Sequence, residues 1–334
     1  MESSPTLWQR GKVWLLSVAA GALFGCIFRL SFNSTNSNDP VPKIWIMTIG
    51  FLFLVPFSMG YLSVDHYLKS TPEETIDWRK WSFLPCMSVS ITMLVTAAFK
   101  WEGAICLIMA APILLVSSML GGIAARWTWG ALKRKSPGKL SAIALPLLFI
   151  LIEAHIPSPN QIRTVPTDIL IHAPASIVWD NIKSVRAIAP SELSSTWVNR
   201  LGFPLPIAAT LSHPGIGGVR QATFTGGLAF KETVNRWEPQ SDLRFSIRAD
   251  TSAIPPTTLD EHVTIGGAFF DVLDGEYQLE PTPNGVLLHL VSHQRLSTHF
   301  NPYAAAWTDA VMRSIQQQIL VVIKNRCETQ QPHG

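Results

Sequence analysis

The sequence predicts a multi-span α-helical membrane region followed by an α+β domain. Two observations carry this prediction. Residues 1–156 contain five long apolar runs, and the rest of the chain alternates apolar and polar residues before it ends in a long amphipathic helix. The composition agrees, because only 15% of the 334 residues are charged, whereas soluble domains contain about 25%. A wholly soluble chain and a disordered chain are therefore not expected.

The first half of the chain is expected to cross a membrane about five times. Each apolar run is close to the ~20 residues that a helix needs to span the hydrocarbon core. No run carries a charge at its middle, which disfavours a pump or transporter and favours an anchor. Arg29, Glu153 and His155 lie near span ends, where polar side chains reach the interface at low cost. The expected spans are 13–32, 44–64, 82–99, 103–125 and 140–156, followed by a linker at 157–163.

Lysine and arginine residues set the expected orientation, because cytoplasmic connections are enriched in them. Ten lie on the side of the amino terminus and three on the other side. The larger group is Arg10, Lys12, Lys69, Arg79, Lys80, Arg126, Lys133, Arg134, Lys135 and Lys139. We therefore expect an integral protein of the plasma (inner) membrane with a cytoplasmic amino terminus. Five crossings place the C-terminal domain on the periplasmic or extracytoplasmic side.

The second half of the chain has the pattern of an antiparallel sheet. After a stiff linker that includes Pro166, period-two alternation predicts a short strand at Thr167–His172 and several later strands. Asp274–Gly275, between two of the later segments, indicates a tight turn or a bulge. The later segments are Leu228–Trp237, Asp242–Asp250, Phe269–Leu273, Glu276–Glu280 and Val286–Gln294.

A long helix closes the chain, with Asn301 as its expected cap and Pro302 in its first turn. Its apolar residues recur every three or four positions, which predicts one buried stripe. Asp309 and Arg313 are four residues apart and are expected on the solvent side. The predicted stripe is Trp307, Val311, Ile315, Ile319 and Val322.

This order of elements is typical of an α+β fold in which a curved sheet surrounds a terminal helix. Residues 164–328 resemble the SRPBCC, or START-like helix-grip, superfamily, and within it the polyketide cyclase/dehydrase and lipid-transport branch; residues 329–334 form a tail. The resemblance rests on Ile171–Asp180 (IHAPASIVWD), Phe230–Pro239 (FKETVNRWEP), Tyr277–Pro281 (YQLEP) with Gly285, and the terminal helix. It implies a cavity that binds a lipid, sterol or polyketide and, in a minority of cases, cyclase activity.

An apolar ligand pocket is predicted between the sheet and the terminal helix. Glu232 shares the inward face with apolar neighbours, and Tyr277 and Ser292 also fall on apolar faces, so these three supply polar groups that orient a ligand. Burial raises the pKa of Glu232, unless an arginine such as Arg236 pairs with it and lowers the pKa. The predicted pocket residues are Phe230, Glu232, Phe245, Tyr277, Leu288, Ser292, Trp307, Val311 and Ile315.

Metal and catalytic sites are not predicted. His289 and His293 lie ~13 Å apart on an extended strand, too far to share one zinc ion at bonds of ~2.1 Å. The sequence has no hydrolase, P-loop or dinucleotide-binding motif, so no catalytic residue and no cofactor are expected. A turn and a solvated edge account for the acidic residues Asp271, Asp274, Glu276 and Glu280.

The expected function is a membrane-anchored domain that binds a membrane lipid or another apolar small molecule. Two alternatives stay open: a membrane-bound cyclase-like enzyme with Glu232 and Tyr277 as acid and base, and an assembly or sensory membrane protein whose domain binds a protein partner. After residue 160 the chain has 13 Lys and Arg against 15 Asp and Glu, a net charge of 13 − 15 = −2. This balance gives no basic groove for nucleic acid, so nucleic acid is not an expected partner.

Overall fold

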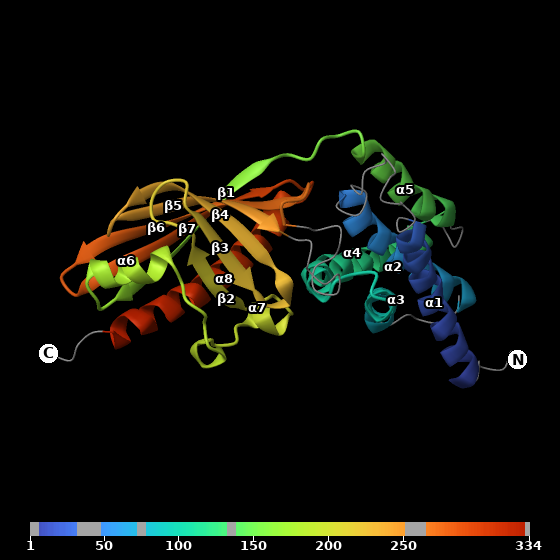
Figure 1. Ribbon diagram of the computed structural model, residues 1–334. Helices are drawn as coiled ribbons and strands as arrows, with labels where there is room; N and C mark the ends of the chain where they lie inside the picture. The colour runs from blue at the N-terminus through green and yellow to red at the C-terminus, as the bar shows by residue number, and fades with distance from the viewer. Residues whose placement is uncertain (1–6, 32–47, 72–77, 132–137, 251–264, 331–334) are drawn as a thin grey trace, which may run out of the picture. The chain divides into compact units, whose positions relative to one another are not determined.

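The chain divides into two compact units, residues 1–158 and 159–334 (Figure 1). The first unit is helical, and the second is a curved antiparallel sheet with helices. The computed structural model describes residues 7–31, 48–71, 78–131, 138–250 and 265–330.

The helices of the first unit lie where the apolar runs predict helices. Residues 44–47 of the second predicted span lie outside the described residues. One π-helical turn, η2 (Gly50–Leu54), leads into α2 (Val55–Ser70). The other helices are α1 (Leu7–Ser31), α3 (Trp78–Ala98), α4 (Ala104–Ala131) and α5 (Gly138–Glu153).

Two of the described helices are long and apolar enough to cross a membrane, Trp8–Leu30 and Ala104–Ala131. The apolar segments of α3 and α5, Ser82–Ala98 and Ser141–Glu153, are shorter. Five crossings and the membrane side of each terminus therefore stay predictions.

Polar and small side chains fill the contacts between these helices. Ser58, Ser63 and Ser88 are fully buried, and the Ser63 and Ser88 hydroxyl oxygens lie 2.7 Å apart in a hydrogen bond. Large apolar side chains lie on both sides of these helices, with Leu84 and Leu68 buried and Leu23 and Leu94 61% and 69% exposed. The outer surface of a water-soluble helical bundle is mostly polar instead.

Two glycines let α2 and α4 approach each other closely. A Cβ atom at Gly60 would lie 1.9 Å from the carbonyl oxygen of Ser118, and one at Gly121 would lie 1.9 Å from the carbonyl oxygen of Phe57. Any side chain at either position would therefore push the two backbones apart. Close helix packing through small residues is the usual packing mode of helices in membranes.

Two charged residues near predicted span ends are buried between helices, which corrects the expectation that they reach toward the interface. Arg29 is 3% exposed and forms an ion pair with Glu102. Glu153 is 4% exposed, and its carboxylate accepts hydrogen bonds from the backbone N–H groups of Ile49 and Gly50 at 2.7 and 2.9 Å. An acidic side chain at a helix amino terminus is favourable, because the free N–H groups there carry partial positive charge.

The second unit is one seven-stranded antiparallel sheet that curls around the C-terminal helix α8 (Asn301–Thr329), as Figure 1 shows. The strand order is β1-β7-β6-β5-β4-β3-β2. This arrangement fits the helix-grip fold predicted for the second half. The strands are β1 (Gln161–Ile171), β2 (Pro206–Leu211), β3 (Val219–Phe224), β4 (Ala229–Glu238), β5 (Asp242–Asp250), β6 (Phe270–Thr282) and β7 (Gly285–Leu296). Between β1 and β2 lie α6 (Ala175–Lys183), η3 (Pro190–Glu192) and α7 (Trp197–Arg200), and η4 (Thr225–Gly227) joins β3 to β4.

The first strand is longer than the sequence predicts. β1 begins at Gln161, so Pro166 and residues 161–163 belong to the strand and not to the linker. β1 lies at the edge of the sheet with β7 as its neighbour. Proline is tolerated in an edge strand because one side of the strand forms no ladder that needs its missing N–H group.

β6 passes through Asp274–Gly275 without a turn, so the turn alternative is wrong. The register against β7 shifts between Val272 and Asp274, which is the bulge alternative. β2 and β3 were not predicted, because their alanine and threonine residues give only weak apolar alternation.

α8 contacts the sheet through only part of the predicted stripe. Val322 is buried and Ile319 packs against the main core, whereas Trp307, Val311 and Ile315 are half-buried. Asp309, Gln316 and Leu320 project from the opposite side of the helix, and all three are buried. Gln316 donates hydrogen bonds to the Val165 carbonyl oxygen of β1 at 3.2 Å and to Ser292 of β7 at 2.9 Å. The buried face therefore includes polar residues, which an apolar repeat does not reveal.

Candidate ligand-binding site

Four neighbouring strands bring a polar cluster onto the face of the sheet that carries α8. Arg220 of β3 lies directly opposite Glu232 of β4. The registers of β4 with β5 and of β5 with β6 place Phe245 and Tyr277 on the same face. Cross-strand neighbours on one face are close enough for their side chains to touch.

The centre of the cluster is a buried ion pair. Arg220 donates from Nη1 to Glu232 Oε2 at 2.5 Å, and the two side chains are 4% and 9% exposed. The guanidinium carbon lies 5.2 Å from the centre of the Phe245 ring and 5.7 Å from the centre of the Tyr277 ring. The charges therefore neutralise each other among aromatic side chains.

Burial and charge act in opposite directions on these groups. Burial raises the pKa of Glu232 above its ordinary value, and the positive charge of Arg220 opposes this rise without cancelling it. Burial lowers the pKa of Arg220, but Glu232 and Tyr277 outweigh this effect and the pKa lies above its ordinary value. Burial also raises the pKa of the Tyr277 hydroxyl. Glu232 thus has an arginine partner, as one alternative predicted, but the partner is Arg220, not Arg236, and the pKa does not fall.

One hydrogen-bond donor of this cluster is unused. The Nε–H group of Arg220 is buried and has no hydrogen-bond partner among the described residues. A buried donor without a partner costs about 1–3 kcal/mol. Such groups in folded proteins usually mark the place of a water molecule, an ion or a ligand.

Three of the predicted pocket residues lie together in the main core of the domain. Phe245, Tyr277 and Leu288 are 3%, 2% and 0% exposed and belong to one apolar cluster. Gly275 makes room for them, because a Cβ atom there would lie 2.8 Å from the Phe245 ring. Ser292 is also buried, but it lies beneath α8 and accepts the hydrogen bond of Gln316.

The remaining predicted pocket residues are half-buried. Phe230 lies in a separate apolar cluster, where its ring meets that of Phe224 edge-on with the ring centres 5.4 Å apart. Trp307 on α8 has Tyr303 as its aromatic neighbour at 6.5 Å. Trp307, Val311 and Ile315 form the half-buried stripe of α8.

Arg220 was missed by the sequence analysis, although the sequence contains the signal that finds it. Gly226 and Gly227 mark the turn between β3 and β4. Counting back from this turn along a two-stranded hairpin places Arg220 opposite Glu232. These glycines indicate a turn, but the strand before them, Val219–Phe224, was not predicted.

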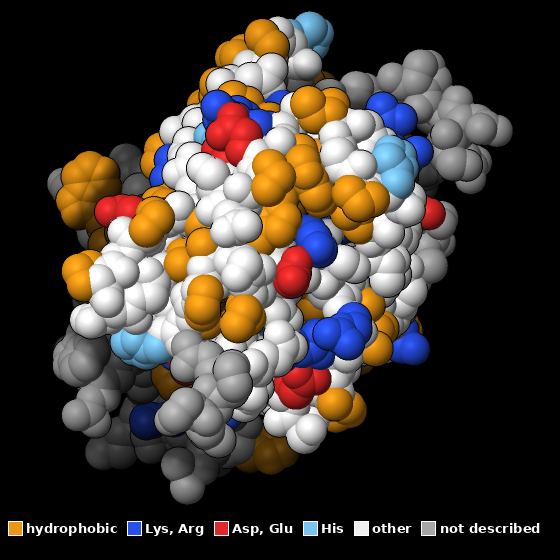
Figure 2. Space-filling view, turned by 60° about the vertical axis from the view of Figure 1, so that its left-hand side comes forward, with side chains coloured by type: hydrophobic (Ala, Val, Ile, Leu, Met, Phe, Trp, Pro, Cys, Tyr) orange, Lys and Arg blue, Asp and Glu red, His pale blue; other side chains and the backbone are white. Residues whose placement is uncertain are grey.

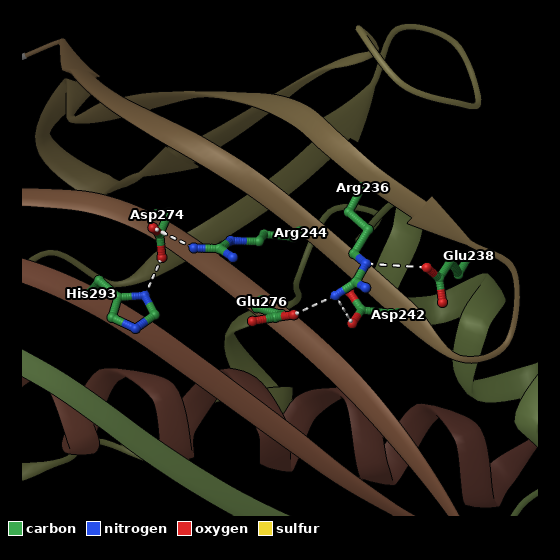
Figure 3. A network of polar contacts seen from close by, with 7 residues as sticks. All are labelled: Arg236, Glu238, Asp242, Arg244, Asp274, Glu276 and His293. Atoms are coloured by element: carbon green, nitrogen blue, oxygen red, sulfur yellow. Dashed lines mark hydrogen bonds and ion pairs between the residues drawn. The ribbon is translucent and has the colours of Figure 1, made fainter.

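The other face of the sheet carries a separate network of ion pairs (Figure 3). Arg236 contacts Glu238, Asp242 and Glu276, and Asp274 contacts both Arg244 and His293. Burial, reinforced by the neighbouring Glu276 carboxylate, raises the pKa of Asp242 to about 6.

These pairs involve His289 and His293, the histidines weighed as zinc ligands. The assignment of the acidic residues to a turn and a solvated edge is wrong for Asp274, which lies within β6, and for Glu276, which is buried. His293 Nδ1 lies 2.5 Å from Asp274, and His289 lies 2.7 Å from Asp168 and 3.2 Å from Glu280. Within the described ranges, no group of three or more His, Cys, Asp and Glu side chains could hold a metal ion. On the face that Figure 2 shows, Lys and Arg side chains lie among Asp, Glu and hydrophobic side chains.

No family model matches the chain, and no curated protein matches it. Several solved structures match about half of it. An uncharacterised protein from Rhizobium leguminosarum is 13% identical over 52% of this chain and 98% of its own, with a TM-score of 0.33. DynU16, a protein of the dynemicin biosynthetic locus, is 16% identical over 51% of this chain and 48% of its own, with a TM-score of 0.30. An AHSA1-like protein from Aeromonas hydrophila is 16% identical over 52% of this chain and 99% of its own, with a TM-score of 0.29.

Proposed function

We propose that this protein is a membrane-anchored binding protein for an apolar, lipid-like molecule. The observation that carries the ligand part is the buried Arg220–Glu232 pair, which lies on an apolar sheet face and leaves one donor unused. Sites for small molecules are mostly apolar and contain a few polar groups that orient the ligand. The half-buried stripe of α8 supplies further apolar surface for this site.

The direction of that stripe supports a site between α8 and the segment before β2. Gln318 lies on the same side of the helix as Val311 and Ile315. It donates hydrogen bonds to the Ser194 carbonyl oxygen at 2.8 Å and to Asn199 at 3.0 Å. Both partners precede β2, so the stripe faces away from β1 and β7.

The anchoring part of the proposal rests on the packing of the first unit. Its helices expose many large apolar side chains and bury several serines, which is favourable in hydrocarbon and unfavourable in water. Two helices have the length and composition of membrane spans. We extend this to five spans, with the amino terminus cytoplasmic and the C-terminal domain periplasmic.

Titration with the apolar fluorophore Nile red tests the ligand site in the full chain. The matched pair of variants is Trp307→Ala, on the stripe, and Ile216→Ala, on a loop where the side chain is 72% exposed. Loss of the Trp307 ring should weaken binding about tenfold, because it removes apolar contact worth ~1.5 kcal/mol. Ile216→Ala should leave binding unchanged, and equal effects of both variants would contradict the proposed site.

Alkaline carbonate extraction tests the anchor. The full chain should stay in the membrane pellet, and its release into the supernatant would contradict membrane insertion. A reporter that is active only in the periplasm, fused after residue 334, tests the orientation. Activity of the matching cytoplasmic reporter instead would reverse the proposed topology.

The cyclase alternative has less support. Glu232 is engaged by Arg220, whereas a general acid or base needs a proton that it can exchange with the substrate.

A further inference from the structure

The unused donor of Arg220 lies in a defined chemical setting. A guanidinium has five N–H bonds. In Arg220, Nη1 donates to Glu232, and the Tyr277 ring lies against the guanidinium. Nε–H is left without a partner in the described part of the chain, although the residue is only 3% exposed. A ligand that brings an oxygen acceptor to Nε would therefore satisfy a donor that the protein leaves unsatisfied.

The charge of the site limits what this acceptor is. Arg220 and Glu232 already neutralise each other within a buried pair. A ligand carboxylate or phosphate would add a second negative charge next to Glu232, and an uncompensated buried charge is strongly unfavourable. An uncharged oxygen, in an ester, ketone or alcohol, accepts the hydrogen bond without this cost.

The surroundings of the pair fit an apolar ligand body. The rings of Phe245 and Tyr277 lie against the guanidinium, and Ile247 lies opposite Glu232 in the sheet. A second polar group on the ligand would meet mostly carbon at these positions. The site therefore favours a molecule with one oxygen-containing group on a hydrocarbon frame.

We propose that the ligand is an uncharged apolar molecule with a single oxygen-containing group, and that Arg220 Nε–H donates to an oxygen of this group. The proposal rests on the apolar-ligand function proposed above and names the chemical class of the ligand. It predicts discrimination between ligands that share a hydrocarbon chain and differ only in oxygen content and charge.

The test is competition of methyl laurate, dodecane and laurate with Nile red on the full chain in detergent micelles, at mildly alkaline pH. Two variants accompany the wild type. Arg220→Lys keeps the positive charge and removes Nε–H. Arg220→Met combined with Glu232→Leu removes both charges together, which avoids leaving one buried charge alone. Unequal partition of the ligands into micelles cancels when each variant is compared with the wild type.

The preference for methyl laurate over dodecane should be about tenfold greater in the wild type than in either variant, the factor expected from one hydrogen bond with a charged donor. Both variants should lose this preference, and the double variant should still bind dodecane. The same ratio of methyl laurate to dodecane affinity in the wild type and both variants would overturn the inference and leave the apolar-ligand function standing. Tighter binding of laurate than of methyl laurate would overturn the uncharged class. Failure of every ligand to displace Nile red would overturn the function and the inference with it.

Discussion

The burial of Asp309 in the structure is the opposite of what the sequence predicts. The sequence places it on the solvent side of the terminal helix with Arg313, whereas it is 8% exposed in the structure. It accepts hydrogen bonds from Arg163 Nε at 3.0 Å and Nη2 at 2.5 Å, and from Gln294 Nε2 at 2.9 Å. These contacts join α8 to both β1 and β7.

Replacement of Asp309 by Ala should destabilise the domain by about 2–4 kcal/mol. Its loss leaves the fully buried Gln294 amide with only a 3.3 Å contact to Thr308, and an unsatisfied buried donor costs ~1–3 kcal/mol. The ion pair with Arg163 adds ~1 kcal/mol, because the Arg163 side chain is 29% exposed and partly screened by solvent. Arg313→Ala is the matched control one turn further along the same helix, where the side chain is exposed, and its effect should stay within ~0.5 kcal/mol.

Urea unfolding of the full chain, combined with hydrogen exchange of peptides from β1 and α8, measures both variants. Asp309→Ala should raise exchange in β1 and α8 together, because it loosens the contact between them. Equal destabilisation by the two variants would refute the argument and restore the solvent-side pair predicted from the sequence.

Three further predictions concern the rest of the molecule. Gly121→Val should separate α2 from α4 and lower the unfolding temperature of the first unit. Gly130→Val is the control and should be nearly neutral, because the nearest atom to a new Cβ there is 3.5 Å away. Equal unfolding temperatures of the two variants would contradict the close contact. The Arg326 hydrogen bonds lower the pKa of Glu192 to about 2. This pair therefore stabilises the domain above the unfolded-state pKa of about 4.3, and the stabilisation is lost as pH falls toward 2. Glu192→Gln should remove this part of the pH dependence of the unfolding free energy, and an unchanged pH dependence between about 4.3 and about 2 would count against the pair. Asp242 has its pKa raised to about 6, so the unfolding free energy should fall by up to ~2 kcal/mol as pH rises from about 4 to about 6. Asp242→Asn should flatten this slope. An identical slope in the variant would show that another group causes the pH dependence.

The fold of the second half was largely predictable, because strand alternation is a local signal. β5 was predicted with the bounds that the structure has, and β4 and β7 within about two residues. β1 was predicted too short because Pro166 was assigned to the linker. The sequence does not show that this strand lies at the edge of the sheet, where proline is tolerated. β2 and β3 were missed because alanine and threonine alternate too weakly.

The candidate site was less predictable, because its central contacts join residues far apart in the chain. The inward direction of Glu232 followed from alternation, but its partner depends on the register between two strands, one of which was missed. The polar part of the buried face of α8 was missed for a similar reason. Asp309 and Gln316 are polar and buried, and their partners Arg163, Gln294 and Ser292 lie on other strands.

A crystal structure of the full chain bound to methyl laurate tests the central claim most directly. We predict that the carbonyl oxygen of the ester lies about 3 Å from Arg220 Nε, with the hydrocarbon chain against Phe245 and the α8 stripe at Val311. We also predict that the Arg220–Glu232 pair stays intact. A ligand bound elsewhere, or an Arg220 Nε–H satisfied by another side chain of the protein while the ligand is present, would contradict this claim.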